Sequence, residues 1–192
     1  MVLDDPEKIF QQQIFQAPPD DIDETWRHGA ILGGILYDVH TTLRVADAFK
    51  LAGDILVDKV LTFDTEAYEI VYPVLYNYRH CLELYLKAVL KDTRGHKLLE
   101  MTEKLEEQIQ KQLKAKLPTW FRKWILEFDE FDRGSDTFRY ADKYVESRHT
   151  QDLGEDLGEF WIDFVLLQKI MTLYQEAFHR LVEITENGGA PS

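Results

Sequence analysis

The sequence contains one cysteine, few residues that interrupt helices and little positive charge. Because Cys81 is the only cysteine, no intramolecular disulfide can form, and this favours a reducing compartment. The 192 residues include ten glycines and six prolines, few enough for a largely helical chain. Lys and Arg number 22 against 35 Asp and Glu, so the formal net charge is −13. A field of this sign repels phosphates, and any RNA-binding role would need a local positive patch.

Long apolar runs are also missing. The longest uninterrupted one, with its two glycines included, covers residues 30–37. A membrane-spanning helix needs roughly 20 apolar residues. The opening residues, MVLDDPEKIF, are acidic where a secretory signal would be positively charged. Together these features predict a cytoplasmic protein that has no contact with a membrane.

The composition that remains is that of a folded domain. Apolar residues make up 45% of the chain and charged residues 30%, which suits a globular protein with a sizeable core. We divide the chain into an acidic N-terminal arm (residues 1–22), one helical domain (residues 23–186) and a disordered tail (residues 187–192). The arm carries the Pro-Pro break of QAPPDDID.

Hydrophobic periodicity predicts helices through most of the domain. A capping box formed by Asp21 and Glu24 starts the first helix near residue 23, and Gly53 ends it. The final helix is apolar on most sides and is expected in the middle of the bundle. The expected helices are residues 23–53, an ambiguous stretch at 54–63 whose position favours helix, 65–92 with a kink or start at Pro73, 96–117, 118–132 and 159–185. Five or six helices without a clear strand predict an all-α bundle.

One charged series stands out inside an apolar helix. Arg79, Glu83 and Lys87 follow one another at steps of four residues along one side of YPVLYNYRHCLELYLKAVLK. On a helix surface such a ladder is worth only a few tenths of a kcal/mol per pair. The surrounding apolar residues leave little exposed face, so we expect Arg79 to be at least part-buried and hydrogen-bonded to Glu83. Structural and functional roles both remain open for this series.

A second stretch combines cations with aromatic rings. Residues 108–126 contain no acid. Cations beside aromatic rings suit stacked bases, whereas helical spacing of the rings suits a core with solvated lysines around it. We favour the core interpretation. The residues concerned are Lys111, Lys114, Lys116, Arg122 and Lys123, with Trp120, Phe121 and Trp124 among them.

The segment YPVLYNYRHCLELYLKAVLKDTRGHKLLEM, followed later by SDTFRYADK, resembles the HEPN superfamily. The resemblance covers residues 72–143 and extends to the final helix. It implies a helical bundle that dimerises and cleaves RNA or binds RNA or nucleotides, often in prokaryotic defence or toxin–antitoxin systems. The residues that it marks for RNA or ligand binding are Arg79, His80, Glu83, Lys87, Arg139 and Tyr140.

The sequence departs from the family at its catalytic motif. Catalytic members carry Arg-x4-6-His, in which the histidine assists the 2′-hydroxyl and the arginine steadies the phosphate. No arginine of this chain has a histidine five to seven residues later. The resemblance therefore implies ribonuclease activity only if Arg139 or Arg148 forms a non-standard centre with His149.

Two other classes of function are compatible with the residues. An acidic helical bundle without catalysis could dimerise or bind a basic protein partner. A di-metal carboxylate bundle is less favoured. Its signal would be Glu146-x-x-His149 and Glu176-x-x-His179, because this spacing aims both side chains inward, but His149 precedes a glycine-containing loop. We therefore predict neither a metal nor another cofactor.

Association is predicted from surplus apolar surface. The final helix and residues 72–91 both carry apolar residues nearly all round, more than one small bundle can bury. The family resemblance also implies pairing through these helices. We expect a homodimer whose interface buries at least about 1,000 Å².

Overall fold

The computed structural model describes residues 41–132 and 161–186, together with eight single positions: 15, 17, 20, 27, 29, 30, 138 and 139. The chain divides into two compact units, Met1–His40 and Thr41–Ser192, and the helices lie in the second. Within the described residues these helices are accompanied by no strand, so the predicted all-α class is confirmed. They are α3 (Thr42–Leu61), α4 (Ala67–Leu90), α5 (Leu98–Leu113), α6 (Thr119–Phe131) and α8 (Phe164–Glu186).

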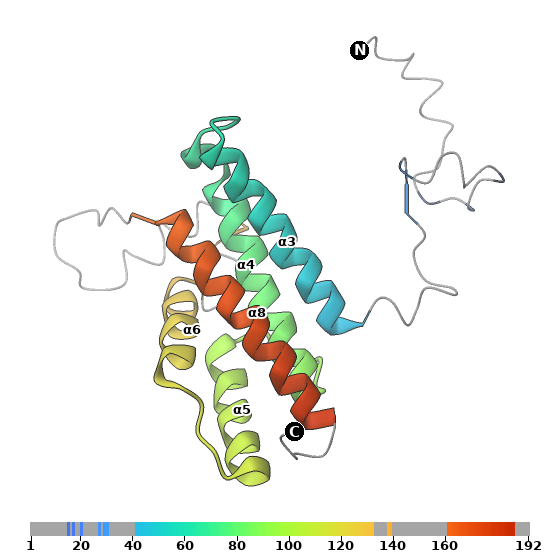
Figure 1. Ribbon diagram of the computed structural model, residues 1–192, viewed down its shortest axis with the longest axis vertical. Coiled ribbons are helices and arrows are strands. Elements are labelled where there is room, and N and C mark those ends of the chain that lie inside the picture. Colours follow the sequence, from blue (N-terminus) through green and yellow to red (C-terminus); the bar gives the residue numbers. More distant parts are fainter. Residues whose placement is uncertain are drawn as a thin grey trace. The chain divides into compact units, whose positions relative to one another are not determined.

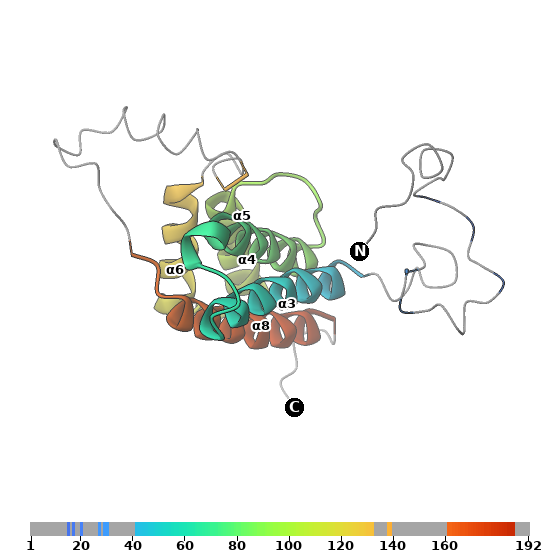
Figure 2. The same ribbon diagram turned by 90° about the horizontal axis from the view of Figure 1, so that it is seen from above.

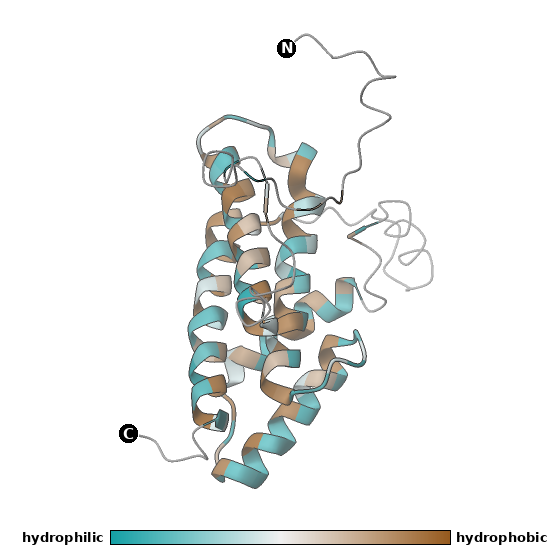
Figure 3. Cartoon of the chain, turned by 90° about the vertical axis from the view of Figure 1, so that its right-hand side faces the viewer, coloured by the Kyte–Doolittle hydropathy of each residue, from teal (hydrophilic) through white to brown (hydrophobic). Residues whose placement is uncertain are grey.

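Helix α4 occupies the centre of the bundle. It forms an antiparallel hairpin with α3, contacts α8 along its length, and packs on its other side against α5 (Figures 1 and 2). Apolar positions of the helices turn toward one another and hydrophilic ones toward the outside (Figure 3). The prediction that the final helix lies in the middle is wrong. Helix α8 buries only one face, while Trp161 just before it is 91% exposed and Leu166 within it is 53% exposed.

Helix α3 begins later and ends later than the sequence predicts. Gly29 and Ala30 are not helical, and Thr41 has extended backbone whose hydroxyl accepts a hydrogen bond from Arg44 N at 3.3 Å. This N-cap starts the helix at Thr42. The helix then continues through Gly53 and includes most of the ambiguous stretch, as its position favoured.

Gly53 of α3 lies directly against the Tyr78 ring of α4. A Cβ atom built there would lie 2.5 Å from Cε1 of the Tyr78 ring, a distance that real Cβ atoms do not adopt. The residue therefore serves close packing between the two helices rather than helix termination. Pro73, the other expected interruption, lies inside α4, six residues after its first residue.

The aromatic residues of α6 belong to the core, as we favoured. The rings of Phe121 and Tyr174 lie edge to face with centroids 5.1 Å apart, and Trp120 packs on Tyr174 at 5.5 Å. Three of the nearby cations, Lys111, Arg122 and Lys123, are paired with acids, and Arg122 reaches Glu106 at 2.5 Å. This stretch therefore covers the α5–α6–α8 side of the core. No helix in the described part of the chain is both long and apolar enough to cross a membrane.

Candidate functional site

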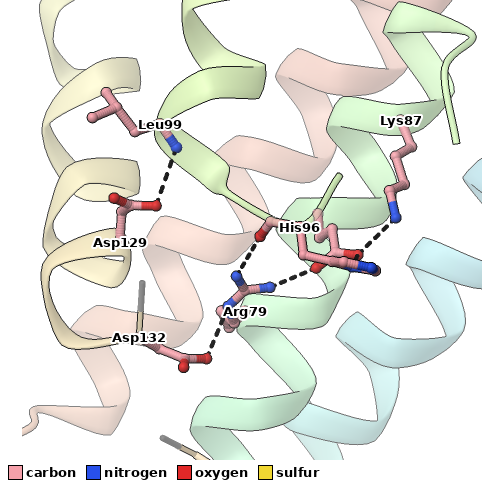
Figure 4. Close-up of polar contacts among 7 residues, drawn as sticks. Arg79, Lys87, His96, Leu99, Asp129 and Asp132 are labelled. Atoms are coloured by element: carbon pink, nitrogen blue, oxygen red, sulfur yellow. Dashed lines mark hydrogen bonds and ion pairs between the residues drawn. The ribbon is translucent and has the colours of Figure 1, made fainter. Parts of the chain in front are cut away.

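The charged series of α4 forms a buried network. One-turn spacing places Arg79, Glu83 and Lys87 on one face of the helix. The guanidinium Nη1 donates to Glu83 Oε2 at 2.6 Å, and Nη2 donates to the backbone carbonyl of His96 at 2.6 Å (Figure 4). Its Nε lies 2.9 Å from Asp132 Oδ2, an ion pair without the direction of a hydrogen bond. Arg79 thus joins α4 to the loop before α5 and to the end of α6.

Glu83 is the shared acceptor of this network. Its Oε1 lies 2.8 Å from Lys87 Nζ and 2.8 Å from His96 Nδ1. Burial alone would raise the pKa of Glu83, but the bonds from Lys87, His96 and Arg79 outweigh burial and hold that pKa below its usual value. Because the ionised carboxylate only accepts, His96 donates through Nδ1–H. The side chains of Arg79 and Glu83 are both 1% exposed, which confirms that this pair is hydrogen-bonded and buried.

The network holds backbone as well as side chains. Asp129 of α6 accepts a hydrogen bond from Leu99 N at 3.2 Å (Figure 4). That amide lies in the first turn of α5, where the N-cap residue Lys97 supplies no side-chain bond. Asp129 therefore satisfies a helix-terminal donor from another helix. The cluster fastens α5 and α6 to α4, and its buried cations, Arg79 and Lys87, are only 1% and 8% exposed.

The other predicted binding residues are dispersed. His80 is half-buried, edge-on to Phe49 at a centroid distance of 4.4 Å and stacked parallel to Tyr76 at 5.8 Å. Burial lowers the pKa of His80, so the ring is neutral at pH 7. Arg139 is exposed, next to Phe138, which packs on Phe128. Tyr140, Arg148, His149 and Glu146 lie outside the described residues.

A second polar cluster, which the sequence did not predict, lies between α3 and α8. Asp47 Oδ1 accepts hydrogen bonds from Tyr85 Oη at 2.6 Å, Gln175 Nε2 at 2.8 Å and His179 Nε2 at 2.9 Å. His179 Nε2 also lies 3.0 Å from the second carboxylate oxygen. The side chains of Asp47 and His179 are 28% and 40% exposed. Unlike Arg79, this pair is open to solvent.

The pair belongs to a polar seam that runs along both helices. Lys50 bonds Asp54 at 2.6 Å and Thr172 at 3.1 Å, and Gln168 donates to Asp58 at 3.1 Å. As residue numbers rise on α3 they fall on α8, so the two helices are antiparallel. The acids of the seam on α3 are Asp47, Asp54 and Asp58; they lie seven and four residues apart, so one face of the helix carries all three.

The electrostatics of the seam define what Asp47 and His179 can do. Burial would raise the pKa of Asp47, but the bonds from Tyr85, His179 and Gln175 dominate and lower it. The carboxylate is therefore ionised at neutral pH. It accepts a hydrogen bond from the N–H group at His179 Nε2. Both contacts with Asp47 use Nε2, so the carboxylate orients the imidazole through that atom and not through Nδ1.

Glu176, the partner of His179 in the proposed metal motif, is exposed on α8. Among the described residues, no group of three or more His, Cys, Asp and Glu side chains has an arrangement that could hold a metal ion.

No protein-family model matches this sequence, and no curated protein or solved structure matches it either.

Proposed function

We propose that this chain is a non-catalytic, HEPN-like interaction module that works as a homodimer, in a cytoplasmic defence or toxin–antitoxin setting. The observation that carries the proposal is apolar surface on the outer faces of α3 and α8. Leu51 and Ile55 of α3 are 58% and 51% exposed, and Leu166 and Leu173 of α8 are 53% and 46% exposed.

The spacing of these residues places the members of each pair on a common helix face. Leu51 and Ile55 are one turn apart, and Leu166 and Leu173 are two turns apart, so each pair lies on one side of its helix. The two helices are neighbours joined by the polar seam. Exposed apolar surface of this kind usually marks an interface. A second copy is the partner that the family resemblance implies.

The buried network supports the non-catalytic part of the proposal. Arg79 and Lys87, which the resemblance marks for RNA, are 1% and 8% exposed and already paired with Glu83. A phosphate could reach them only by breaking those pairs, which would leave Glu83 buried without its counterions.

Light scattering of the full chain tests the proposal. We expect twice the chain mass of 22.6 kDa at tens of micromolar. Leu173→Asp should shift the mass toward the monomer, because a charge in an apolar interface core is strongly unfavourable. Phe63→Ser, which removes a 95% exposed ring from the turn between α3 and α4, is the matched control and should leave the dimer intact. A clean monomer for the unmodified chain would overturn the proposal.

An RNA-related role is the second candidate, either RNA binding or a variant ribonuclease, and the open Asp47–His179 pair favours it. A carboxylate-oriented histidine is suited to general acid–base chemistry. RNA cleavage without added metal, measured on the purified chain, is the test. We expect little or none, because the Arg-x4-6-His motif is missing. Cleavage that His179→Ala abolishes would establish the seam as the centre, whereas loss with His149→Ala would point to the centre with Arg139 or Arg148.

A further inference from the structure

The turn between α3 and α4 carries large apolar side chains that the fold leaves in solvent. We refer to residues 58–69 as the α3–α4 tip; it forms the upper end of the hairpin in Figure 1. Phe63 is 95% exposed, Tyr68 75% and Leu61 46%. Of the large apolar side chains in the described residues, Phe63 has the highest exposure. Its ring contributes nothing to the core.

Phe63 also occupies a backbone position that suits glycine. Asp64 N donates to Lys59 O at 2.9 Å and Phe63 N to Val60 O at 3.0 Å. This pair of bonds is the Schellman motif that ends many helices, and Phe63 takes the left-handed position that is usually glycine. Its φ is 60°, a left-handed backbone conformation that is strained for a residue with a side chain. A phenylalanine at this position is thus unfavourable for both backbone conformation and solvation.

The ends of α4 and α5 provide a comparison. Lys91 and Lys114 also adopt positive φ, each at 53°. Both are exposed, but a lysine side chain is well solvated. The tip differs from these two helix ends in placing an aromatic ring, not a charged chain, at the strained position. Strain combined with exposed apolar surface indicates a role outside the fold.

Side-chain bonds hold the tip in a defined shape. Asp64 Oδ2 lies 2.9 Å from both Lys59 Nζ and Thr62 Oγ1. Beyond the turn, Thr65 Oγ1 donates to Glu69 Oε2 at 3.1 Å. The backbone that carries Phe63 is therefore fixed before any partner arrives, and less conformational entropy is lost on binding.

The charge of the tip selects among partners. Four acids, Asp58, Asp64, Glu66 and Glu69, stand against the single Lys59, which gives a net charge of −3. Nucleic acids and anionic membranes would be repelled by this surface. A protein with a basic surface would be attracted to it.

We propose that the α3–α4 tip is a docking site for a second protein, whose apolar pocket receives the Phe63 ring and whose rim carries Lys or Arg side chains. A single buried aromatic anchor surrounded by complementary charge is a common energetic centre of protein interfaces. This site is separate from the outer faces of α3 and α8 proposed for dimerisation, so either proposal can fail without the other.

Phe63→Gly tests whether the ring serves the fold. Glycine accepts the left-handed position without strain, so the melting temperature should stay unchanged or rise by up to about 4 °C. The mass of the oligomer, measured by light scattering, should not change. A clear fall in melting temperature would show that Phe63 stabilises the fold and would overturn the proposal.

Photo-crosslinking in cells of the source organism tests the partner. The probe is the full chain with p-benzoylphenylalanine in place of Phe63. We expect one protein adduct, with the cross-linked peptide mapping to an apolar site flanked by Lys or Arg. The same probe in place of Lys111, an exposed residue of α5, is the control and should not form this adduct.

A charge reversal makes the test specific. Glu66 has no side-chain capping bond in α4, so Glu66→Lys changes the charge of the tip without removing a described cap. In the probe background it should lower the adduct yield at least about threefold. Phe63→Gly should weaken binding of the purified, identified partner at least about tenfold. No adduct, an adduct with nucleic acid, lipid or a second copy of this chain, or a protein adduct insensitive to Glu66→Lys would overturn the proposal.

Discussion

The two polar clusters on opposite faces of α4 are built from similar groups but differ in solvent exposure. In one, Glu83 accepts bonds from Arg79, Lys87 and His96; in the other, Asp47 accepts bonds from Tyr85, Gln175 and His179. Both carboxylates have lowered pKa values. The Glu83 side chain is 1% exposed, whereas that of Asp47 is 28% exposed. The number of bonds alone therefore does not distinguish a structural cluster from an accessible one.

Solvent access determines how much stability is lost when one partner of a charged pair is removed. A charge left without its partner in the buried cluster around Glu83 cannot be rehydrated unless the junction of α4, α5 and α6 opens. A charge left alone in the seam can be solvated where it stands, because water already reaches both Asp47 and His179. We therefore expect large stability effects and no ligand role at Arg79, but smaller stability effects and available chemistry at Asp47.

Arg79→Ala should have the largest effect. Removing the guanidinium leaves Glu83 and Asp132 buried with fewer counterions, at a cost of about 3–5 kcal/mol in the free energy of unfolding. Urea unfolding measures the change. Arg122→Ala is the matched control, because Arg122 also pairs with two acids, Glu103 and Glu106, but is 36% exposed. It should cost less than about 1 kcal/mol. Equal costs for the two arginines would refute the distinction between the clusters.

Local sequence spacing was enough to predict the first half of the buried cluster. Arg79 and Glu83 are four residues apart on a strongly apolar helix, so both their pairing and their burial followed from one helical repeat. The remaining partners were not predictable in this way. The acceptor on His96 is a backbone carbonyl, and Asp132 follows a different helix; neither has a pattern in the sequence that points to Arg79.

The seam was missed because its partners are far apart in the chain. Asp47 and His179 are separated by 132 residues, and only the packing of α8 against α3 brings them together. The predicted central position of α8 was wrong for a related reason. Its first turns are rich in apolar residues, but composition does not show which of them face outward, and Leu166 does. Gly53 likewise was interpreted as a helix end, although its role depends on the Tyr78 ring of another helix.

Asp47→Asn should have an intermediate effect. The amide is neutral and accepts hydrogen bonds more weakly than the carboxylate, so we expect a loss of about 1–2 kcal/mol at pH 7, reduced by the solvent that reaches the site. The pKa of Asp47 is lowered in the folded state. Its contribution is therefore present above the unfolded pKa of about 3.9 and is lost as pH falls through the lower folded value.

Unfolding at neutral and at acidic pH checks this sign. The difference between the unmodified chain and Asp47→Asn should be largest near neutral pH and should shrink as pH falls below about 4. Asp54→Asn, which alters the neighbouring acceptor of Lys50 and Tyr78, shows whether the effect is specific to the His179 pair. A difference that grows on acidification would contradict the assignment of an ionised Asp47.

His96→Ala should have the smallest effect, although His96 belongs to the buried cluster. Its side chain is 69% exposed, and Glu83 keeps its bonds to Arg79 and Lys87 when the imidazole is removed. The backbone carbonyl that accepts from Arg79 also remains. We therefore expect a loss below about 1 kcal/mol in the free energy of unfolding, as for an exposed ion pair.

Urea unfolding of His96→Ala and Lys87→Met is the decisive measurement. Lys87→Met removes the 8% exposed ammonium that is bonded to the same carboxylate oxygen. If exposure determines the energetic effect within a cluster as well as between clusters, Lys87→Met lowers the free energy of unfolding more than His96→Ala does. The reverse order would mean that the imidazole, not the buried amine, keeps Glu83 ionised.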